Sequence, residues 1–163
     1  MSITYAFGDI LDWADKVDVI GHQVNCFGIM GGGLALQIAK EWPKVESDYR
    51  KYVERISRDV LVNEGELRRN LLGVCQIVAT DKCSIANLFG QYDVGLGRRT
   101  DYDALFKSLK ALKKQMIDCG KRKLALPVNL GCGLAGGDWS IVQEIIEKIF
   151  KDIQIELLLV SYS

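Results

Sequence analysis

Hydrophobic positions along the chain follow two patterns that alternate, one typical of strands and one typical of helices. Short apolar runs of strand length predict strands at residues 3–7, 17–24, 74–79, 84–89, 123–128 and 153–160. Apolar residues three or four positions apart predict a short helical piece at residues 10–14, helices at residues 34–41, from Pro43 onward and from Thr100 onward, and a last helix that buries Val142 to Phe150. Strands that alternate with helices are typical of a mostly parallel sheet covered on both faces. The pattern therefore predicts an α/β fold, a three-layer α/β/α sandwich on a central mixed, mostly parallel sheet of about six strands, in one domain over residues 1–163.

Residues that favour helix ends mark several boundaries. Pro43 suits the first position of a helix, where its missing N–H is not needed. Thr100 with Asp103 resembles a capping box and would start a helix there, and Gly120 suits the position after a helix end. The charged residues 57–70 are predicted to form a loop, with a helical turn inside it as the alternative.

Two glycine-rich stretches each lie between a predicted strand and a predicted helix. The first, GHQVNCFGIMGGGLALQIA, covers residues 21–39, and the second, LGCGLAGGDW, covers residues 130–139. Glycine lets a ligand approach backbone N–H groups closely, and a helix that begins there adds the positive end of its dipole. Two such loops facing each other could grip one ligand from two sides, and a diphosphate suits that geometry.

Charge and cysteine content restrict the class of protein. Lys plus Arg and Asp plus Glu both number 21, so no overall field attracts nucleic acid or an anionic membrane, and any nucleic-acid role must be local. The five cysteines are odd in number and widely spaced, which fits neither a disulfide scaffold nor a Cys-x-x-Cys metal site. Reduced thiols indicate a cytosolic protein. Without a leader pattern or an apolar run of roughly 18 to 20 residues, we expect a soluble protein, cytoplasmic or, in a eukaryote, nuclear, with no membrane partner.

Three groups of residues lie at the ends of predicted strands. They are Gly8-Asp9-Ile10, then His22 and Asn25-Cys26 followed by Gly31-Gly32-Gly33, and finally Gly131-Cys132-Gly133-Leu134. In this order, and over nearly the whole chain, they resemble the macro domain family of ADP-ribose-binding proteins, and within it the ADP-ribose 1″-phosphate phosphatase branch. The resemblance implies a single macro domain with ADP-ribose and its derivatives as ligands, and no cofactor or metal.

The resemblance also implies where each part of the ligand lies. Adenine would lie at Gly8, Asp9 and Ile10, with its amino group on the Asp9 carboxylate; the alternative for Asp9 is a turn or helix cap. The distal ribose would lie at Asn25, whose amide can both donate and accept hydrogen bonds. The diphosphate would lie between two loops, formed by Gly31, Gly32, Gly33 and Leu34 and by Gly131, Cys132, Gly133 and Leu134.

His22 and Asp138 are the candidate catalytic residues. His22 is the only histidine, and an ordinary pKa near 6.5 suits proton transfer, although a histidine at a strand end can also be merely hydrogen-bonded in place. Asp138 could cap the last helix, but Ser140 with Gln143 forms a better capping box, which would leave the Asp138 carboxylate free in the loop. We therefore expect hydrolysis of the terminal phosphate of ADP-ribose 1″-phosphate. The alternatives are a hydrolase that removes ADP-ribose from protein or nucleic acid, and a non-catalytic ADP-ribose reader.

Two other motifs in the second glycine stretch are set aside. Residues 131–136 match GxGxxG, but a nicotinamide site places this motif after the first strand of a βαβ unit with an acidic residue about 20 positions on, and here only one strand follows. Cys132 at a turn before a helix resembles a phosphatase nucleophile. Those enzymes need an arginine six residues later, where this chain has Asp138, so we interpret Cys132 as a small residue in a tight turn.

Residues 91–99, QYDVGLGRR, are predicted to form a flexible loop at the end of the strand at residues 84–89. Macro domains that cleave ADP-ribose from glutamate or from DNA bases use a lysine in this loop, where the sequence here has Gln91. Glutamine forms no Schiff base with an opened ribose, which argues against a lysine-linked route. Arg98 and Arg99 are most simply solvated charges, and the alternative is that they attract an anion to the cleft.

Overall fold

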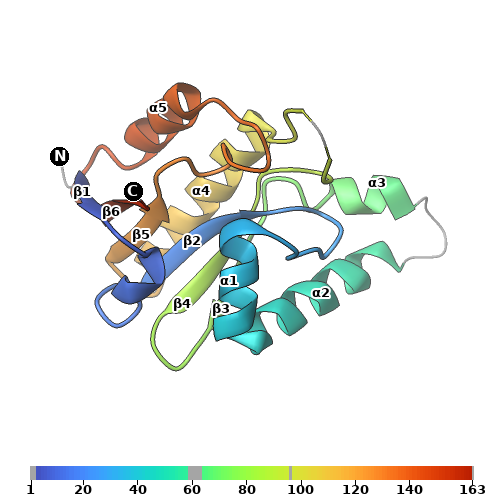
Figure 1. The fold of residues 1–163 in the computed structure, drawn as a ribbon, viewed down its shortest axis with the longest axis horizontal. Helices are drawn as coiled ribbons and strands as arrows, with labels where there is room; N and C mark the ends of the chain where they lie inside the picture. The colour runs from blue at the N-terminus through green and yellow to red at the C-terminus, as the bar shows by residue number, and fades with distance from the viewer. Residues whose placement is uncertain (1–2, 59–63, 96, 163) are drawn as a thin grey trace.

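The computed structural model describes residues 3–58, 64–95 and 97–162, whose arrangement is shown in Figure 1. In chain order the elements are β1 (Ile3–Phe7), the 3-10 helix η1 (Ile10–Trp13), β2 (Val19–Val24), α1 (Gly33–Glu41), α2 (Pro43–Ser57), α3 (Glu64–Arg69), β3 (Cys75–Ala79), β4 (Ser84–Phe89), α4 (Tyr102–Asp118), β5 (Lys123–Pro127), α5 (Trp139–Ile149) and β6 (Glu156–Ser161). All the predicted strands are present. None of the described helices is long and apolar enough to span a membrane.

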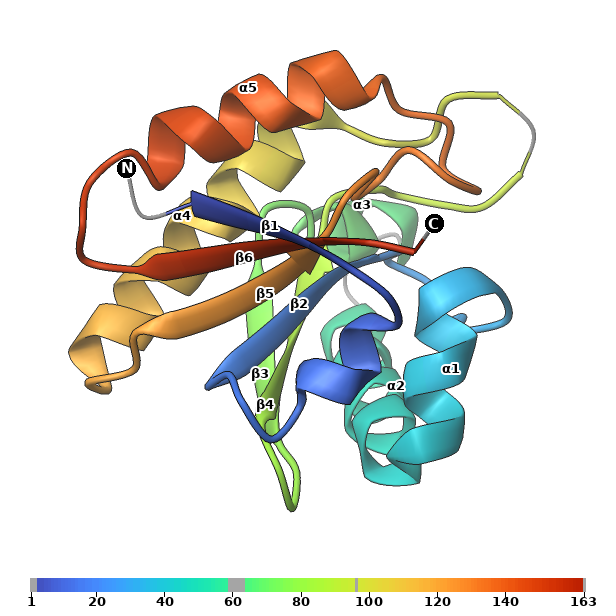
Figure 2. The same ribbon diagram turned by 60° about the vertical axis from the view of Figure 1, so that its left-hand side comes forward.

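The strands form one six-stranded sheet in the order β1-β6-β5-β2-β4-β3. Neighbouring strands run parallel except β3 and β4, which form an antiparallel pair. Helices α1 and α2 cover one face of this sheet, and α4 and α5 cover the other (Figure 2). The predicted three-layer sandwich on a mixed, mostly parallel sheet is therefore confirmed.

Each face of the sheet has its own core. Alternate residues of β2 point to opposite faces, so Ile20 packs with α2 residues such as Tyr49, whereas Val19 packs with α4 residues such as Leu109. Every residue of β4 is buried, as expected for a strand that is covered on both faces. This two-sided burial holds the carboxyl ends of the central strands in place.

Strand β2 lies at the point where the strand order reverses. It pairs with β4 from Val19 to Val24, but with β5 only at Val19 and Ile20, although β5 continues to Pro127. The carboxyl ends of β2 and β5 therefore diverge. Open parallel sheets bind ligands in the crevice outside the strand ends at such a switch point.

Some of the predicted boundaries hold and others need correction; the strands predicted at residues 17–24 and 153–160, for example, begin at Val19 and Glu156. Pro43 begins α2, Gly120 follows α4 with a φ of 73°, and β4 has the predicted bounds. The capping box at Thr100 is wrong, because Asp101 is the N-cap of α4 and accepts a hydrogen bond from the N–H of Ala104.

The predicted loop at residues 57–70 is also only partly right. Residues Glu64–Arg69 form the short helix α3, which exceeds the helical turn named as the alternative. Residues 59–63 of the predicted loop lie outside the described residues.

Candidate functional site

A cleft of about 840 Å³ lies at the carboxyl ends of β2, β4 and β5. Its walls come from the end of β2, the loop that leads into α1, the loop after β4 and the loop after β5. The lining comprises residues 22–25, 29, 31–35, 91, 94, 95, 99, 127–131 and 133–135. This volume is typical of a site for a small molecule.

The two glycine-rich loops meet across this cleft, as the sequence predicts. A Cβ atom on Gly32 would lie 2.8 Å from Cδ1 of Leu134, so only glycine permits this approach without a shift of the leucine. Gly131 has a φ of 71°, and a Cβ there would lie 2.8 Å from Oε1 of Gln23. Gly28 is different, because it faces Arg50 of α2 and is not part of the lining.

Both loops present backbone donors that no protein group uses. The first turn of α1 leaves the N–H groups of its opening residues without intrahelical acceptors, and its N-cap, Gly32, has no side chain to supply one. In the described structure no acceptor is recorded for the N–H groups of Gly31, Gly32, Gly33, Leu34, Gly133 and Leu134. Arg99 is the only charged side chain of the described lining at neutral pH. The cleft is therefore electropositive and suits an anion.

His22 is held by a chain of side-chain amides that begins at α2. Gln76 of β3 donates through Nε2 to the backbone carbonyl of Asp48, at 3.2 Å, so its Oε1 must be the acceptor for Nδ2 of Asn87, at 3.0 Å. This orientation leaves Oδ1 of Asn87 facing Nε2 of His22, 2.6 Å away. Because Oδ1 can only accept, the proton of the neutral ring lies on Nε2 and Nδ1 carries the lone pair.

The buried position of His22 also fixes its charge. Burial lowers the pKa of the imidazole to about 4, with the hydrogen bond to Asn87 as the smaller, opposing effect. His22 lines the cleft, and among the described residues Nδ1 is not one of the buried side-chain atoms that lack a partner, so this atom is open to the cleft. The ring therefore offers the cleft an unprotonated acceptor at neutral pH.

Asn25 holds the loop that follows β2. Its Oδ1 accepts hydrogen bonds from the N–H groups of Phe27 and Ile29, at 2.9 and 3.3 Å, and lies 3.0 Å from Oη of Tyr49. Its Nδ2 donates to the carbonyl of Ile29, at 2.8 Å. The expectation that this amide both donates to and accepts from a ligand is therefore too broad, because the oxygen is already occupied and one Nδ2 hydrogen remains.

A second polar network, which the sequence did not reveal, joins the remaining two loops. Nε2 of Gln23 donates to Oε1 of Gln91 and to Oγ1 of Thr100, both at 2.9 Å, and Thr100 donates in turn to the carbonyl of Gly131. Gln91 also donates to the carbonyl of Asp93, at 2.9 Å, so both ends of its amide are engaged. A clue was available, because Gln23 is a polar residue between His22 and Asn25 at the same strand end.

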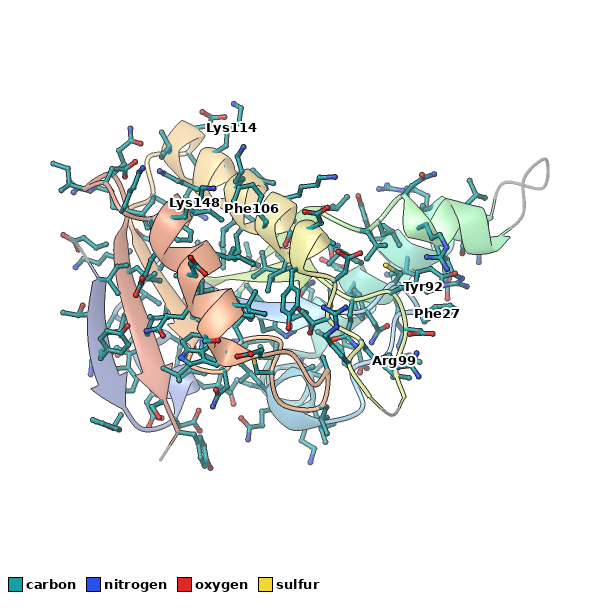
Figure 3. The ribbon with its side chains drawn as sticks, turned by 90° about the horizontal axis from the view of Figure 1, so that it is seen from above. Phe27, Tyr92, Arg99, Phe106, Lys114 and Lys148 are labelled. Atoms are coloured by element: carbon teal, nitrogen blue, oxygen red, sulfur yellow. The ribbon has the colours of Figure 1, made fainter. Side chains whose placement is uncertain are left out.

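Aromatic rings and arginines fix α3 to the rim of the cleft. Phe27 and Tyr92 pack edge to face with centroids 5.1 Å apart, and Arg68 and Arg69 of α3 lie over them at 4.7 and 4.1 Å. Figure 3 shows Phe27, Tyr92 and Arg99 on the same side of the molecule. Arg99 lines the cleft and lies 3.5 Å from Asp93, whereas Arg98 lies over the ring of Tyr102 and is not part of the lining.

Comparison with known proteins identifies the family. No family model matches the chain. The ADP-ribose 1″-phosphate phosphatase of Saccharomyces cerevisiae is 25% identical over 93% of this chain and 95% of its own length, and the ADP-ribose glycohydrolase OARD1 of Homo sapiens is 26% identical over 95% and 88%. The macrodomain of Mycobacterium tuberculosis DarG superposes with a TM-score of 0.77 at 24% identity, covering 99% of this chain and 98% of that one. The chain belongs to the macro domain family.

In this macro domain Asp138 lies outside the cleft lining. Its side chain is exposed and caps α5, where Oδ1 accepts hydrogen bonds from the N–H and the hydroxyl of Ser140, at 2.9 and 2.7 Å. These bonds lower the pKa of the carboxyl group. The predicted capping box of Ser140 and Gln143, which would have left the Asp138 carboxylate free, is therefore wrong.

Cys132 is likewise not part of the cleft lining and packs against the core under α4 and α5. Its thiol donates to the carbonyl of Leu130, at 3.3 Å, and its N–H donates to the carbonyl of Asn129, at 2.8 Å. Burial, with a smaller effect of Asp138, raises the pKa of the thiol to about 11. A raised pKa is the opposite of what a nucleophilic thiol needs, so the interpretation of Cys132 as a turn residue is confirmed. Its N–H is already used by Asn129 and is therefore not available to the ligand that the sequence predicted for it.

The residues expected to bind adenine lie at the end of β1 and outside the cleft lining. Gly8 donates its N–H to Ser161, Asp9 caps η1 by accepting from the N–H of Leu11 at 3.0 Å, and Ile10 is buried in the core. The capping role that the sequence left open for Asp9 is therefore confirmed. Among the described residues no group of three or more His, Cys, Asp or Glu side chains could hold a metal ion.

Proposed function

We propose that this macro domain binds ADP-ribose in the cleft and hydrolyses the terminal phosphate of ADP-ribose 1″-phosphate. The observation that carries the proposal is the set of unused N–H groups on the two facing glycine loops, beside the N-terminus of α1 and Arg99. Such donors complement a diphosphate without a counter-ion. The similarity to the yeast phosphatase and the human glycohydrolase supports the ligand class and a hydrolytic reaction.

The chemistry of each wall suggests how ADP-ribose would lie. The diphosphate lies between residues 31–34 and residues 133–134, whose N–H groups have no acceptor within the described structure. The distal ribose lies beside Asn25, which offers it one remaining amide hydrogen, and its terminal phosphate lies toward His22. A ribose hydroxyl can accept that hydrogen, and Nδ1 of His22 then stays free for the attacking water.

The adenine end then extends toward the carboxyl ends of β1 and β6. Gly8, Asp9 and Ile10 remain the proposed adenine contacts, with the second carboxylate oxygen of Asp9 facing the amino group. Phe7 and Tyr162 are 75% and 76% exposed at the ends of these two strands, and a flat exposed ring is suited to stack on a purine. We include them in the proposed site, although the sequence did not single them out.

For catalysis, we assign proton transfer to His22. The neutral ring has its lone pair on Nδ1, and a bound phosphate dianion would raise its lowered pKa by favouring the imidazolium. Water attacks phosphorus while the bond between phosphorus and the C1″ oxygen breaks. Nδ1 takes a proton from the water and returns it to the departing oxygen, which yields ADP-ribose and inorganic phosphate.

Backbone N–H groups and the α1 dipole carry the charge of the transferred phosphoryl group, so we propose that no metal ion takes part. Asp138, the second residue expected to be catalytic, is exposed and bonded to Ser140. We therefore assign it a role in holding the start of α5 and test a catalytic role directly by mutation.

The second candidate function is removal of ADP-ribose from modified protein or nucleic acid. Its support is the name of the human relative, an ADP-ribose glycohydrolase. The described lining contains no lysine, and Gln91 uses both ends of its amide within the protein, so a lysine-linked intermediate has no residue to form it. A reader that binds ADP-ribose without turnover is the remaining alternative.

Calorimetric titration with ADP-ribose, AMP and NAD tests the ligand. Two backbone-lined phosphate sites and an adenine site should give roughly micromolar affinity for ADP-ribose, about 8 kcal/mol, and weaker binding of AMP. Tight binding of NAD with no heat from ADP-ribose would contradict the proposed ligand.

Incubation with separate substrates tests the reaction. ADP-ribose 1″-phosphate, ADP-ribosylated protein and ADP-ribosylated DNA are each incubated with the protein in the presence of a chelator, and released phosphate and ADP-ribose are measured. We expect release of phosphate from the first substrate alone. Release of ADP-ribose from protein or DNA would support the second function, and binding without any release would make the protein a reader.

A further inference from the structure

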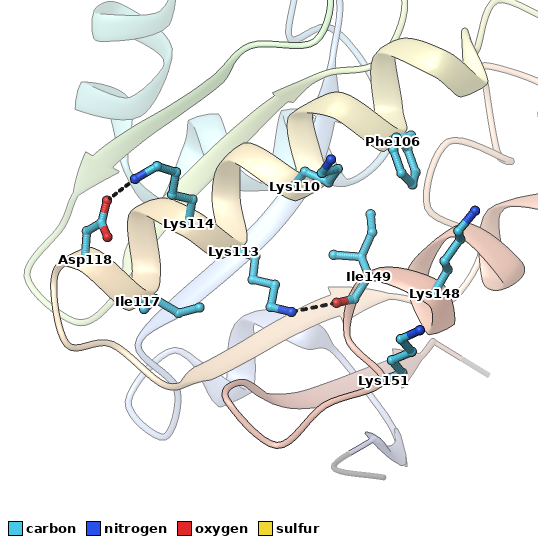
Figure 4. A pocket seen from close by; sticks show the side chains of 9 residues that line it. All are labelled: Phe106, Lys110, Lys113, Lys114, Ile117, Asp118, Lys148, Ile149 and Lys151. Carbon is cyan, nitrogen blue, oxygen red and sulfur yellow. Dashed lines mark hydrogen bonds and ion pairs between the residues drawn. The ribbon is translucent and has the colours of Figure 1, made fainter.

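A second hollow of about 450 Å³ lies between α4 and α5, away from the glycine loops. Phe106, Ile117 and Ile149 form its apolar floor, and five lysines surround them with a single aspartate, Asp118. Figure 4 shows Lys113 of α4 reaching Ile149 of α5 across the hollow, whereas Lys114 points toward Asp118. We call this hollow the lysine groove; its lysines are Lys110, Lys113, Lys114, Lys148 and Lys151.

The positive charge of the lysine groove is a local concentration. The whole chain carries 21 basic and 21 acidic residues, so its net charge is zero. Lys113 is used within the fold, because it bonds Asp152 at 2.6 Å and the carbonyl of Ile149 at 2.9 Å, and Lys114 pairs with Asp118 at 2.8 Å. The remaining lysines therefore leave the groove with an excess of positive charge.

Two of those remaining ammonium groups lie near the same aromatic ring. Nζ of Lys110 lies 5.4 Å and Nζ of Lys148 lies 5.9 Å from the centroid of Phe106. Neither lysine is within ion-pair distance of a carboxylate in the described structure. Two ammonium groups without a carboxylate partner beside one ring leave positive charge that an anionic group could neutralise.

We propose that the lysine groove binds an acidic segment of a partner protein, with carboxylates on the lysines and an apolar side chain on the floor. An amphipathic helix laid along two packed helices combines these features. Nucleic acid is a poorer fit, because Phe106 is the only aromatic of the lining and its ring is engaged by two lysines. A second copy of the chain is a poorer fit too. Its acidic residues Asp9, Asp12, Asp15 and Glu41 line a hollow, and a hollow cannot insert into the groove.

The position of the lysine groove allows both sites to be occupied together. Helix α4 begins at Tyr102, next to Thr100, which bonds the cleft residue Gly131. Lys114 lies further along the helix by about 18 Å at the usual rise per residue. Figure 3 likewise shows Phe106, Lys114 and Lys148 on the opposite side from Arg99. A partner in the groove would therefore leave the cleft open.

The test uses a synthetic 15-residue peptide with glutamates on one helical face and leucines and a phenylalanine on the other, titrated into the full chain by NMR. We expect saturable binding below about 100 μM, shifts at residues 106–118 and 148–151, and at least tenfold weakening at high salt. A scrambled peptide of the same composition should bind at least tenfold more weakly.

Variants locate the contact. Lys110→Glu with Lys148→Glu should weaken the peptide at least tenfold, whereas the control pair Lys40→Glu with Lys51→Glu, also exposed, should change it less than twofold. Circular dichroism checks that both pairs stay folded. No saturation by 1 mM, equal effects of the two pairs, or tighter binding of a 15-mer of thymidine than of the peptide would overturn the proposal, as would dimerisation that the groove variants abolish. None of these results depends on ADP-ribose.

Discussion

His22 carries its proton on Nε2 because the backbone of α2 orients Gln76, Gln76 orients Asn87, and Asn87 presents its oxygen to the ring. The sequence singles out His22 as the one histidine at a strand end. It gives no sign of Asn87, which is 65 positions away and becomes a neighbour only through the register that pairs His22 with Asn87. Single residues at strand ends can thus be predicted, whereas their hydrogen-bond partners need the sheet.

The lowered pKa of His22 makes stability depend on pH. Its pKa is about 4 in the folded chain and near 6.5 when unfolded, so between these values the unfolded state binds the proton more readily. Stability is therefore fully present above about pH 6.5 and is lost as the pH falls toward 4, by about 2 to 3 kcal/mol from this group.

Urea unfolding of wild type and His22→Gln at pH 7 and pH 4.5 isolates this effect from the carboxylates. We expect wild type to lose about 2 kcal/mol more than the variant over this range. Equal losses in the two proteins would mean that His22 is not held neutral by burial.

Asp138 illustrates a local signal that was misread. Ser140 and Gln143 fit a capping box, yet Asp138 is the residue that caps α5 and bonds Ser140. We expect Asp138→Ala to lower the melting temperature and leave phosphate release within about threefold of wild type, and Asp138→Asn, which keeps the acceptor oxygen, to recover most of the stability. A loss of more than about tenfold in rate in both variants, with the fold intact, would give Asp138 a catalytic role instead.

At the scale of elements, the glycine loops were predictable because each glycine run falls between a predicted strand and a predicted helix, in an order that is fairly specific. That the two loops face each other was also expected, and Gly32 lies close to Leu134. The start of α4 was mistaken by one residue, since Thr100 and Asp101 are both good caps and only the tertiary bond of Thr100 to Gly131 leaves the cap to Asp101. Local capping signals cannot decide between two adjacent candidate N-cap residues when the side chain of one of them forms a tertiary hydrogen bond.

Two alanine substitutions in the second glycine loop should show whether the backbone conformation and close contacts of Gly131 matter for stability, or whether any added methyl group in the loop has the same effect. Gly131→Ala forces a left-handed φ on alanine and places Cβ against Gln23, so we expect a loss of about 1 to 3 kcal/mol in the free energy of unfolding.

Gly133→Ala is the matched control, because a Cβ there meets nothing within 4 Å and its φ is not positive. It should change stability by less than about 0.5 kcal/mol. Chemical denaturation measures both variants, and similar losses in the two would contradict the described shape of the loop.

At the scale of the whole molecule, the alternation of strands and helices was enough to predict the sandwich. The sequence could not show that β2 and β5 part after Ile20, because strand pairing depends on how distant segments dock. That divergence opens the cleft, and the site therefore emerges only from the assembled sheet.

Binding in this cleft should stabilise the whole fold. With ADP-ribose at 100 times its dissociation constant, the free energy of unfolding should rise by about 2.7 kcal/mol, which for a chain of this size corresponds to roughly 5 to 10 °C in melting temperature. Differential scanning calorimetry with ADP-ribose, and with AMP at the same concentration as the control, measures this. An equal rise in melting temperature with both ligands would mean that the distal ribose and its phosphate make no contact in the proposed site.

The most direct test of the proposed function is single-turnover release of phosphate from ADP-ribose 1″-phosphate by wild type and His22→Ala, with a chelator present. We expect the wild type to release phosphate, and His22→Ala to be slower by about 10² to 10⁴ while its affinity for ADP-ribose changes less than about tenfold. A His22→Ala rate within tenfold of wild type, or a wild-type rate that the chelator abolishes, would contradict the mechanism proposed for this cleft.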